Sequence, residues 1–269
     1  MVHLSSASSE PVVSAPARPP RVGGWTAHTL SFLSLIGWGV AALHLPDYLL
    51  PGPIEVARQI LHLLGSPDFL LDASFSILHI VGSIAVAFVF GLSLALLTHF
   101  VLVVRTAIYG RLNPFLASFS TIGWVFLAVI WFGLNDFTVM FVVAMTLMPF
   151  ALSNLRAALV ELDKEMIEMG RSFGRGRARL VRLMMLPLMV PFLFATLRIC
   201  LGVAWKVMLT AELFGGTSGF GHVISRARAN LDTPTIFAVI VIIVALVYIT
   251  DKFMFEPLNL RMRRNYAVA

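Results

Sequence analysis

The sequence predicts an all-α membrane protein with about six transmembrane helices. Hydrophobic residues fill 58% of its 269 positions and charged residues only 13%, whereas soluble domains carry about 25% charged residues. The hydrophobic residues also gather into runs of about 20, the length that an α-helix needs to cross the hydrocarbon layer. An ordinary soluble domain is therefore excluded.

Six apolar segments account for the predicted spans: residues 25–43, 74–98, 115–133, 137–155, 187–212 and 236–255. Gly37 and Gly39 interrupt the first segment. Only Gly133 to Asp136 separate the third segment from the fourth, which predicts a tight turn at one membrane face. We assign residues 23–256 to one transmembrane domain.

The two ends of the chain lack apolar runs. Residues 1–22 are rich in Ser, Pro and Ala and predict a disordered cytoplasmic tail rather than a signal peptide. Residues 257–269 form a second cytoplasmic tail. With the amino terminus inside, fifteen of the twenty Lys and Arg residues fall on its side of the membrane and three on the other. This bias predicts that both termini are cytoplasmic.

The net charge of +6 has a simple explanation in a membrane protein. Positive residues on the cytoplasmic side and attraction to anionic lipid headgroups account for it, so we expect membrane lipid and no nucleic acid as partners. Cys200 is the single cysteine and lies within an apolar run. A disulfide framework and a thiolate metal cluster are therefore excluded.

The outer connection between the first two spans predicts a short amphipathic helix. Pro53 opens it, and apolar residues follow at helical spacing, namely Val56, Ile60, Leu61, Leu63 and Leu64. Proline suits the first turn of a helix. Such a helix would lie along the membrane surface or on the outer ends of the spans; a plain connector is the alternative.

A charged segment, residues 156–187, lies between the fourth and fifth apolar runs. It holds seven Lys and Arg residues, each of which would cost roughly 2.5–3.5 kcal/mol at mid-depth in hydrocarbon. The segment must therefore be a hydrophilic loop. Within it, Glu168-Met169-Gly170 is followed after three residues by Gly174, and after nine more by Met184-Met185-Leu186-Pro187.

This spacing resembles the EAA signature of bacterial ABC-importer membrane subunits: E-A-A, three residues, G, nine residues, I-x-L-P. Met169 and Gly170 stand in place of two alanines, and Met184 in place of isoleucine. The resemblance implies a type I importer fold whose cytoplasmic loop forms a coupling helix that docks on an ATPase. The residues that it assigns to ATPase coupling are Glu168, Met169, Gly170, Ser172, Phe173, Gly174, Leu186 and Pro187.

The fifth apolar segment carries a second resemblance. Its run L-R-I-C-L-G-V-A-W-K, ending in Ala211-Glu212-Leu213, is similar to L-R-I-x-L-G-x-x-W…A-E-[LM] of nitrate, taurine and aliphatic sulfonate permeases. The similarity covers roughly residues 50–255. It implies a homodimeric permease of the bacterial inner membrane that works with ABC ATPase subunits and a periplasmic or lipid-anchored solute-binding protein. ATP and Mg would bind the ATPase, so this chain is expected to hold no cofactor.

Arg198 and Lys206 are candidate pathway residues. They lie about 80° apart around one helix and roughly 12 Å along it, so both can face a bundle interior. A cation there needs water, a counter-ion or an anionic ligand. For Arg198 the alternative is a loop carboxylate or helix carbonyls near the cytoplasmic end. For Lys206 the alternatives are an ion pair with Glu212 or Asp136, or snorkelling.

Glu212 is the third candidate for the pathway. It lies about 240° around the helix from Lys206, which disfavours a direct pair within one straight helix. We expect instead that it pairs with Arg226 or Arg228 at the outer face.

Trp205 and Trp124 complete the candidate pathway set. Interfacial anchoring or bundle packing is the simpler role for both, and stacking on a ligand is the alternative. Sulfonate-type permeases begin the third span with a proline-rich stretch before Ala-Trp, whereas this chain has Ser120 to Trp124 there. That departure affects the expected substrate rather than the fold.

Nothing in the sequence indicates a catalytic or metal site. The seven histidines do not cluster, and neither a helical zinc pair nor a P-loop occurs, so a non-enzyme is predicted. We expect import of a small anion such as a sulfonate, taurine or nitrate. The alternatives are a neutral or heterocyclic vitamin precursor, an ion-coupled secondary transporter, which would show inverted repeats and broken helices with acidic ion sites, and a membrane-embedded enzyme or receptor scaffold.

Overall fold

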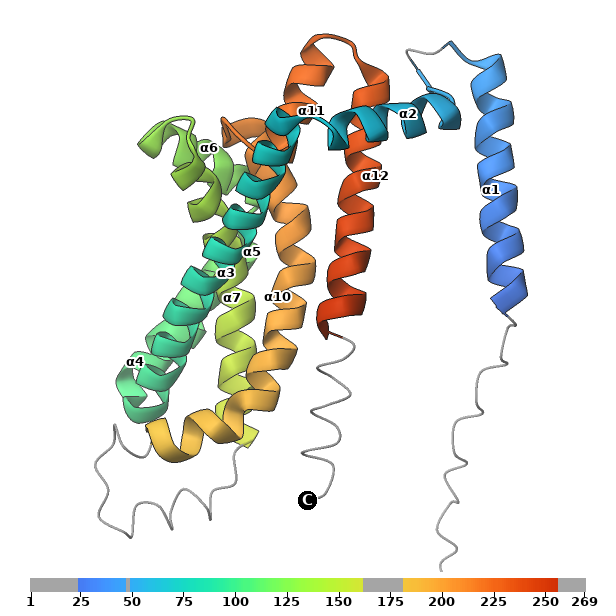
Figure 1. Cartoon of the computed structure of the whole chain (residues 1–269). Helices are drawn as coiled ribbons and strands as arrows, with labels where there is room; N and C mark the ends of the chain where they lie inside the picture. The colour runs from blue at the N-terminus through green and yellow to red at the C-terminus, as the bar shows by residue number, and fades with distance from the viewer. Residues whose placement is uncertain (1–23, 47–48, 162–180, 256–269) are drawn as a thin grey trace, which may run out of the picture.

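A computed structural model describes residues 24–46, 49–161 and 181–255, and all regular elements in these ranges are helical (Figure 1). Four helical stretches of the described chain are long and apolar enough to cross a membrane. They are α3 (Pro67–Phe100), α7 (Asp136–Glu161), α10 (Leu186–Gly215) with the π-turn η2 (Val181–Met185) before it, and α12 (Thr233–Thr250) with the π-turn η3 (Asp251–Phe255) after it. The predicted all-α membrane fold is confirmed.

The third predicted span is not one straight helix. The chain runs through α4 (Leu102–Ala107), the π-turn η1 (Ile108–Leu112) and α5 (Asn113–Ser118), breaks, and continues as α6 (Thr121–Phe132). The two halves are bent by 90°. The prediction of an unbroken span over 115–133 was wrong, because hydropathy measures apolar content and does not register the two extended residues at the break.

The first predicted segment forms α1 (Gly24–His44), a continuous helix of 21 residues despite its two glycines. Trp38 of α1 stacks on Phe237 of α12, with ring centroids 6.2 Å apart. All six predicted apolar segments are therefore helical, although α1 is not among the four stretches named above.

The centre of the bundle is formed by α3, α7 and α10. Small residues let α3 and α7 approach closely: a Cβ added at Gly91 of α3 would lie 3.1 Å from the Cβ of Ala151 on α7. Close packing of small residues is the usual basis of helix association in membranes. The predicted tight turn is present, because α6 ends at Phe132 and α7 begins at Asp136, and the Asn135 amide donates to the Gly215 carbonyl of α10.

Two short helices, α2 (Pro53–Leu64) and α11 (Phe220–Ala229), lie at one end of the bundle (Figure 1). The predicted amphipathic helix is confirmed: α2 has proline in its first turn, buries Val56 and leaves Leu61 exposed. Its Gln59 donates to the hydroxyl of Thr235 on α12 at 2.7 Å. The predicted helix therefore packs on the end of a span.

The other end of the bundle is where the described chain enters and leaves the spans. The beginning of α1, the end of α7, the beginning of α10 and the end of α12 all lie toward that end (Figure 1). The two tails and residues 162–180 lie outside the described residues, so their side of the membrane stays a prediction.

Candidate functional site

The core of the predicted coupling segment, Glu168, Met169, Gly170, Ser172, Phe173 and Gly174, lies outside the described residues. Leu186 and Pro187 are described and form the start of α10, directly after η2. Proline is tolerated there because the first amides of a helix have no intrahelical acceptor.

One face of α10 is exposed and carries the two candidate cations. Ala195, Arg198, Gly202 and Lys206 are exposed and recur every three or four residues, which places them on one side of the helix. A face with two cations and a glycine differs from the leucine-rich surface that lipid favours. It is the face of this helix most suited to contact water or a ligand.

Arg198 has a carboxylate partner. Its Nε and Nη2 atoms each donate to Asp251 of η3 at 3.1 Å, and both side chains are about half exposed, at 48% and 54%. This two-point contact balances the charge of the guanidinium at the end of the bundle that carries η3. Of the alternatives for Arg198, the structure shows pairing with a carboxylate.

Lys206 has no such partner. Among the described residues, no side chain forms a hydrogen bond or ion pair with its ammonium group, and the side chain is exposed. The two carboxylates considered for it, Glu212 and Asp136, face His79 instead. Lys206 lies about two-thirds of the way along α10, and an uncompensated cation within a spanning helix must meet water, an anion or another chain.

Glu212 lies at the centre of a buried polar cluster near the C-terminal end of α10. It is 1% exposed. His79 lies 2.8 Å away, measured from Nδ1 to Oε1, while Ser76 Oγ and the Gly221 amide donate to Oε2 at 3.0 and 2.9 Å. A carboxylate with three partners is adequately satisfied for burial.

The expected pairing of Glu212 with Arg226 or Arg228 is therefore wrong. Both arginines lie on the exposed side of α11, whereas the Glu212 side chain points from α10 toward α3. Burial against α3 requires the nearer polar groups of that helix to serve as partners.

The same cluster fixes the first turn of α11. The amides of Gly219 and Phe220 donate to Asp72 Oδ1 at 2.9 Å and to Ser76 Oγ at 2.8 Å. With the bond from Gly221 to Glu212, three successive amides at this helix N-terminus are taken up by side chains of α3 and α10. Carboxylates suit this position because they complement the helix dipole.

Asp136 connects α7 to the cluster. It accepts a hydrogen bond from Ser218 at 2.6 Å, and its Oδ1 lies 3.6 Å from Nε2 of His79. Each ring nitrogen of His79 thus faces a carboxylate, so α3, α7, α10 and the α10–α11 turn meet around one imidazole.

Two glycines make this geometry possible. Gly219 has φ +94°, a conformation that side chains rarely adopt, and a Cβ there would overlap the Glu212 carboxyl group. A Cβ at Gly221 would overlap the side chain and backbone at Glu212 and Leu213. The glycines of the Gly-Phe-Gly run thus leave room for one carboxylate.

Trp124 and Trp205 are only 5% and 6% exposed, which identifies both as residues of the bundle core rather than interfacial anchors. Neither indole nitrogen has a hydrogen-bond partner in the described part of the chain. Buried indole N–H groups usually have one.

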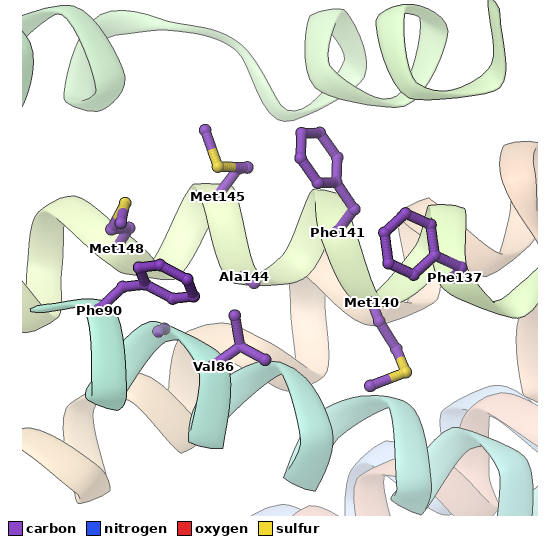
Figure 2. A pocket seen from close by; sticks show the side chains of 9 residues that line it. Val86, Phe90, Phe137, Met140, Phe141, Ala144, Met145 and Met148 are labelled. Carbon is purple, nitrogen blue, oxygen red and sulfur yellow. The ribbon is translucent and has the colours of Figure 1, made fainter. Parts of the chain in front are cut away.

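An apolar cavity of about 430 Å³ lies between α3 and α7 (Figure 2). The side chains that line it are all hydrophobic: Val86, Ala87, Phe90, Phe137, Met140, Phe141, Ala144, Met145 and Met148. Its walls offer flexible methionines and aromatic rings, which suit an apolar body of variable shape.

Sequence reasoning missed the α3 partners of Glu212, although a signal was present. Asp72, Ser76, His79 and Ser83 recur at intervals of four, three and four residues within a largely apolar helix. This spacing puts them on one face, and a polar stripe in a span must face the protein interior.

Helices long enough to span a membrane, a broken span and a buried polar cluster between helices define a polytopic membrane protein. Residues 87–264 match the family described as "Binding-protein-dependent transport system inner membrane component". The chain belongs to this family. Its members are the membrane components of ABC transporters, which form the pore and work with separate ATPase and binding-protein partners.

Curated relatives agree with this family. The chain is similar to the taurine transport permease protein TauC of Escherichia coli, with 28% identity over 83% of each chain. It is 29% identical to a putative aliphatic sulfonates permease, SsuC of the same species, over 46% of this chain and 48% of that one. A riboflavin transport permease, RibX of Chloroflexus aurantiacus, is 35% identical over 47% of this chain and 48% of that one.

Among solved structures, the MetNI methionine ABC transporter contains a chain of the same fold. The TM-score is 0.55 at 18% identity, over 65% of this chain and 87% of that chain. This similarity confirms a fold of the type I importer kind.

Proposed function

We propose that this chain forms the translocation pathway of an ABC importer for a small organic or inorganic anion, with sulfonates such as taurine as the favoured class. The observation that carries the proposal is Lys206, a cation about two-thirds of the way along α10 whose ammonium has no partner among the described residues. An anion crossing the membrane supplies the charge that this site lacks. The names of two relatives, taurine and sulfonate permeases, support the same class.

The energy would come from partner subunits. The segment between Glu161 and Val181, which contains Glu168 to Gly174, would dock on a cytoplasmic ATPase that binds ATP and Mg. Two copies of the chain would form the pore, and a solute-binding protein would deliver the anion at the end that carries α2 and α11. Closure of the ATPase dimer would move the coupling segments together, with Gly174 and Pro187 as hinges, and open the pathway outward.

A different substrate class and a different energy source are the alternatives to this proposal. Partial similarity to a riboflavin permease supports a neutral heterocyclic substrate as the second candidate. An ion-coupled secondary transporter is disfavoured by the family match, although the break before α6 is a feature that secondary transporters share.

The test is uptake by the chain reconstituted with its ATPase and binding protein in lipid vesicles. We expect ATP-dependent taurine uptake, retention of that uptake in Lys206→Arg, and a loss of at least tenfold in Lys206→Met, which keeps the side-chain length. Arg58→Met on exposed α2 is the matched control. Uptake of riboflavin but not taurine, or equal taurine rates for Lys206→Arg and Lys206→Met, would contradict the proposal.

A further inference from the structure

The first turn of α6 presents a group of hydrogen-bond donors without acceptors. Phe119 and Ser120 have extended backbones that break the helix. The amides of Thr121, Ile122 and Gly123 then begin α6 and have no acceptor within it. Among the described residues nothing else accepts from these amides, and the hydroxyls of Ser120 and Thr121 form no hydrogen bond with a side chain or carbonyl there.

A buried side chain adds a further donor to this group. Trp124 is 5% exposed, and its indole N–H has no partner in the described ranges. Its ring lies against Phe119, with centroids 4.7 Å apart, and helical side chains lean toward the N-terminus of their helix. Gly123 permits this packing, since a Cβ there would lie 3.0 Å from the Phe119 ring. The Trp124 ring therefore packs against Phe119 at the break.

The break lies at the surface of the bundle, where Ser118 and Ser120 are exposed, whereas Trp124 of the same turn is buried. Trp124 contacts Phe141 of α7 at 6.1 Å between ring centroids, and Phe141 is five residues, about 7.5 Å, from the N-terminal end of α7. Lipid-exposed non-helical backbone does not occur within the hydrocarbon layer, so in the membrane the break must be covered by protein or line a watery path. Ser120 and Ile122 are exposed on the single chain, so this terminus is accessible.

The chemistry of the group favours an anion. It consists of N–H and O–H donors at the positive end of a helix dipole, with no carboxylate recorded in contact with it. Phe141, which contacts Trp124, also lines the apolar cavity of about 430 Å³ (Figure 2). The hydrogen-bond donors at the first turn of α6 and the apolar wall of this cavity therefore lie next to each other.

We propose that the first turn of α6, with the Ser120 and Thr121 hydroxyls and the Trp124 indole, binds the oxyanion headgroup of the transported solute. This proposal rests on the proposed function and adds a named site to it. A sulfonate offers three oxygens to converging donors, and its organic part would lie toward the cavity. A lipid phosphate offers the same headgroup chemistry, so the test separates the two sources.

The decisive comparison is Ser120→Asp with Ser120→Asn in the reconstituted complex. Ser120 is the N-cap of α6, and both replacements are good N-caps, but aspartate places a fixed negative charge where the anion would bind. The probes are taurine and hexanesulfonate. We expect the maximal uptake rate to fall at least tenfold in Ser120→Asp and to stay within twofold in Ser120→Asn, with unchanged ATPase stimulation by the loaded binding protein in both.

A second pair of variants tests the amides themselves. Thr121→Pro and Thr121→Val both lack the hydroxyl, but only proline removes the amide hydrogen. Proline fits because Thr121 is the first helical residue and Ser120 has ψ 139°, the conformation that precedes proline. We expect slower uptake in Thr121→Pro than in Thr121→Val at equal thermal stability.

Three outcomes would overturn the site. Equal uptake by the Asp and Asn variants, with normal uptake by the unsubstituted chain, would remove the site and leave the proposed function standing. Loss of co-purified phosphatidylglycerol in Ser120→Asp at unchanged taurine uptake would assign the site to lipid. Absence of anion uptake by the unsubstituted complex would overturn the proposed function and this site with it.

Discussion

The Nδ1 atom of His79 on α3 lies 2.8 Å from Oε1 of Glu212 on α10, with both side chains 1% exposed or less. This contact joins two residues that are separated by 133 positions in the chain. Ser76, Asp136 and the first turn of α11 form their hydrogen bonds or ion pairs around it. The end of the bundle that carries α2 and α11 is therefore held by polar contacts, while close packing of small residues brings α3 and α7 together farther along.

Removal of the carboxylate should destabilise this end strongly. Glu212→Ala would leave His79, Ser76 and the Gly221 amide buried without a partner. Loss of one member of a buried pair typically costs about 3–5 kcal/mol in unfolding free energy. Thermal unfolding of the purified chain in detergent measures this loss of unfolding free energy. The control is Glu55→Ala at an exposed position of α2, which should change the unfolding free energy by no more than about 0.5 kcal/mol. Similar stability of the two variants would contradict this account.

The glycines beside Glu212 should not tolerate a methyl group. Gly219→Ala combines a left-handed backbone with overlap of the carboxyl group, and Gly221→Ala overlaps Glu212 and Leu213. We expect each to lower the unfolding free energy by about 1–3 kcal/mol. Gly52→Ala is the control because a Cβ there meets nothing within 4 Å. Both effects should be visible in the same thermal assay, and a neutral result at Gly221 would argue against the described packing.

The pair between Arg198 and Asp251 should contribute little to stability. Both side chains are about half exposed, and exposed ion pairs are usually worth about 0–1 kcal/mol. A double-mutant cycle with Arg198→Ala and Asp251→Ala should give a coupling energy within this range. A coupling above about 2 kcal/mol would mean that the pair is shielded from water in the assembled protein.

The coupling segment can be tested although it lies outside the described residues. Gly174→Asp is expected to abolish ATP-driven uptake and leave membrane insertion intact, because it disturbs the docking loop and not the spans. Glu168→Lys should release the ATPase during purification from detergent-solubilised membranes. A tagged chain that never retains an ATPase would show that the loop has another role.

The fold was predictable from the sequence because a membrane-spanning helix needs a run of about 20 predominantly apolar residues, and such runs can be recognised by composition and length. The turn between Phe132 and Asp136 was also readable from the polar residues that interrupt the apolar run. The break at Phe119 and Ser120 was not, because the run Ser118-Phe119-Ser120-Thr121 contains neither proline nor glycine, and hydroxyl residues also occur within membrane helices. Amino-acid composition says little about the backbone conformation of a single residue.

The buried cluster was only partly predictable. Glu212 was recognised as a residue that needs a partner, but nearby arginines were favoured over a histidine 133 positions earlier. Local spacing gives the face of a helix on which a residue lies, and it does not give the helix that packs there. The polar stripe on α3 was the available evidence for that neighbour.

The long separation of His79 and Glu212 has a consequence for biosynthesis. When α3 leaves the ribosome, its stripe of Asp72, Ser76 and His79 has no carboxylate from α10 to meet, because Glu212 is made 136 residues after Ser76. The nascent helix must enter the bilayer with polar groups whose permanent partners do not yet exist. Chains that stop before α10 would keep this stripe unmatched, which makes them natural targets for membrane quality control.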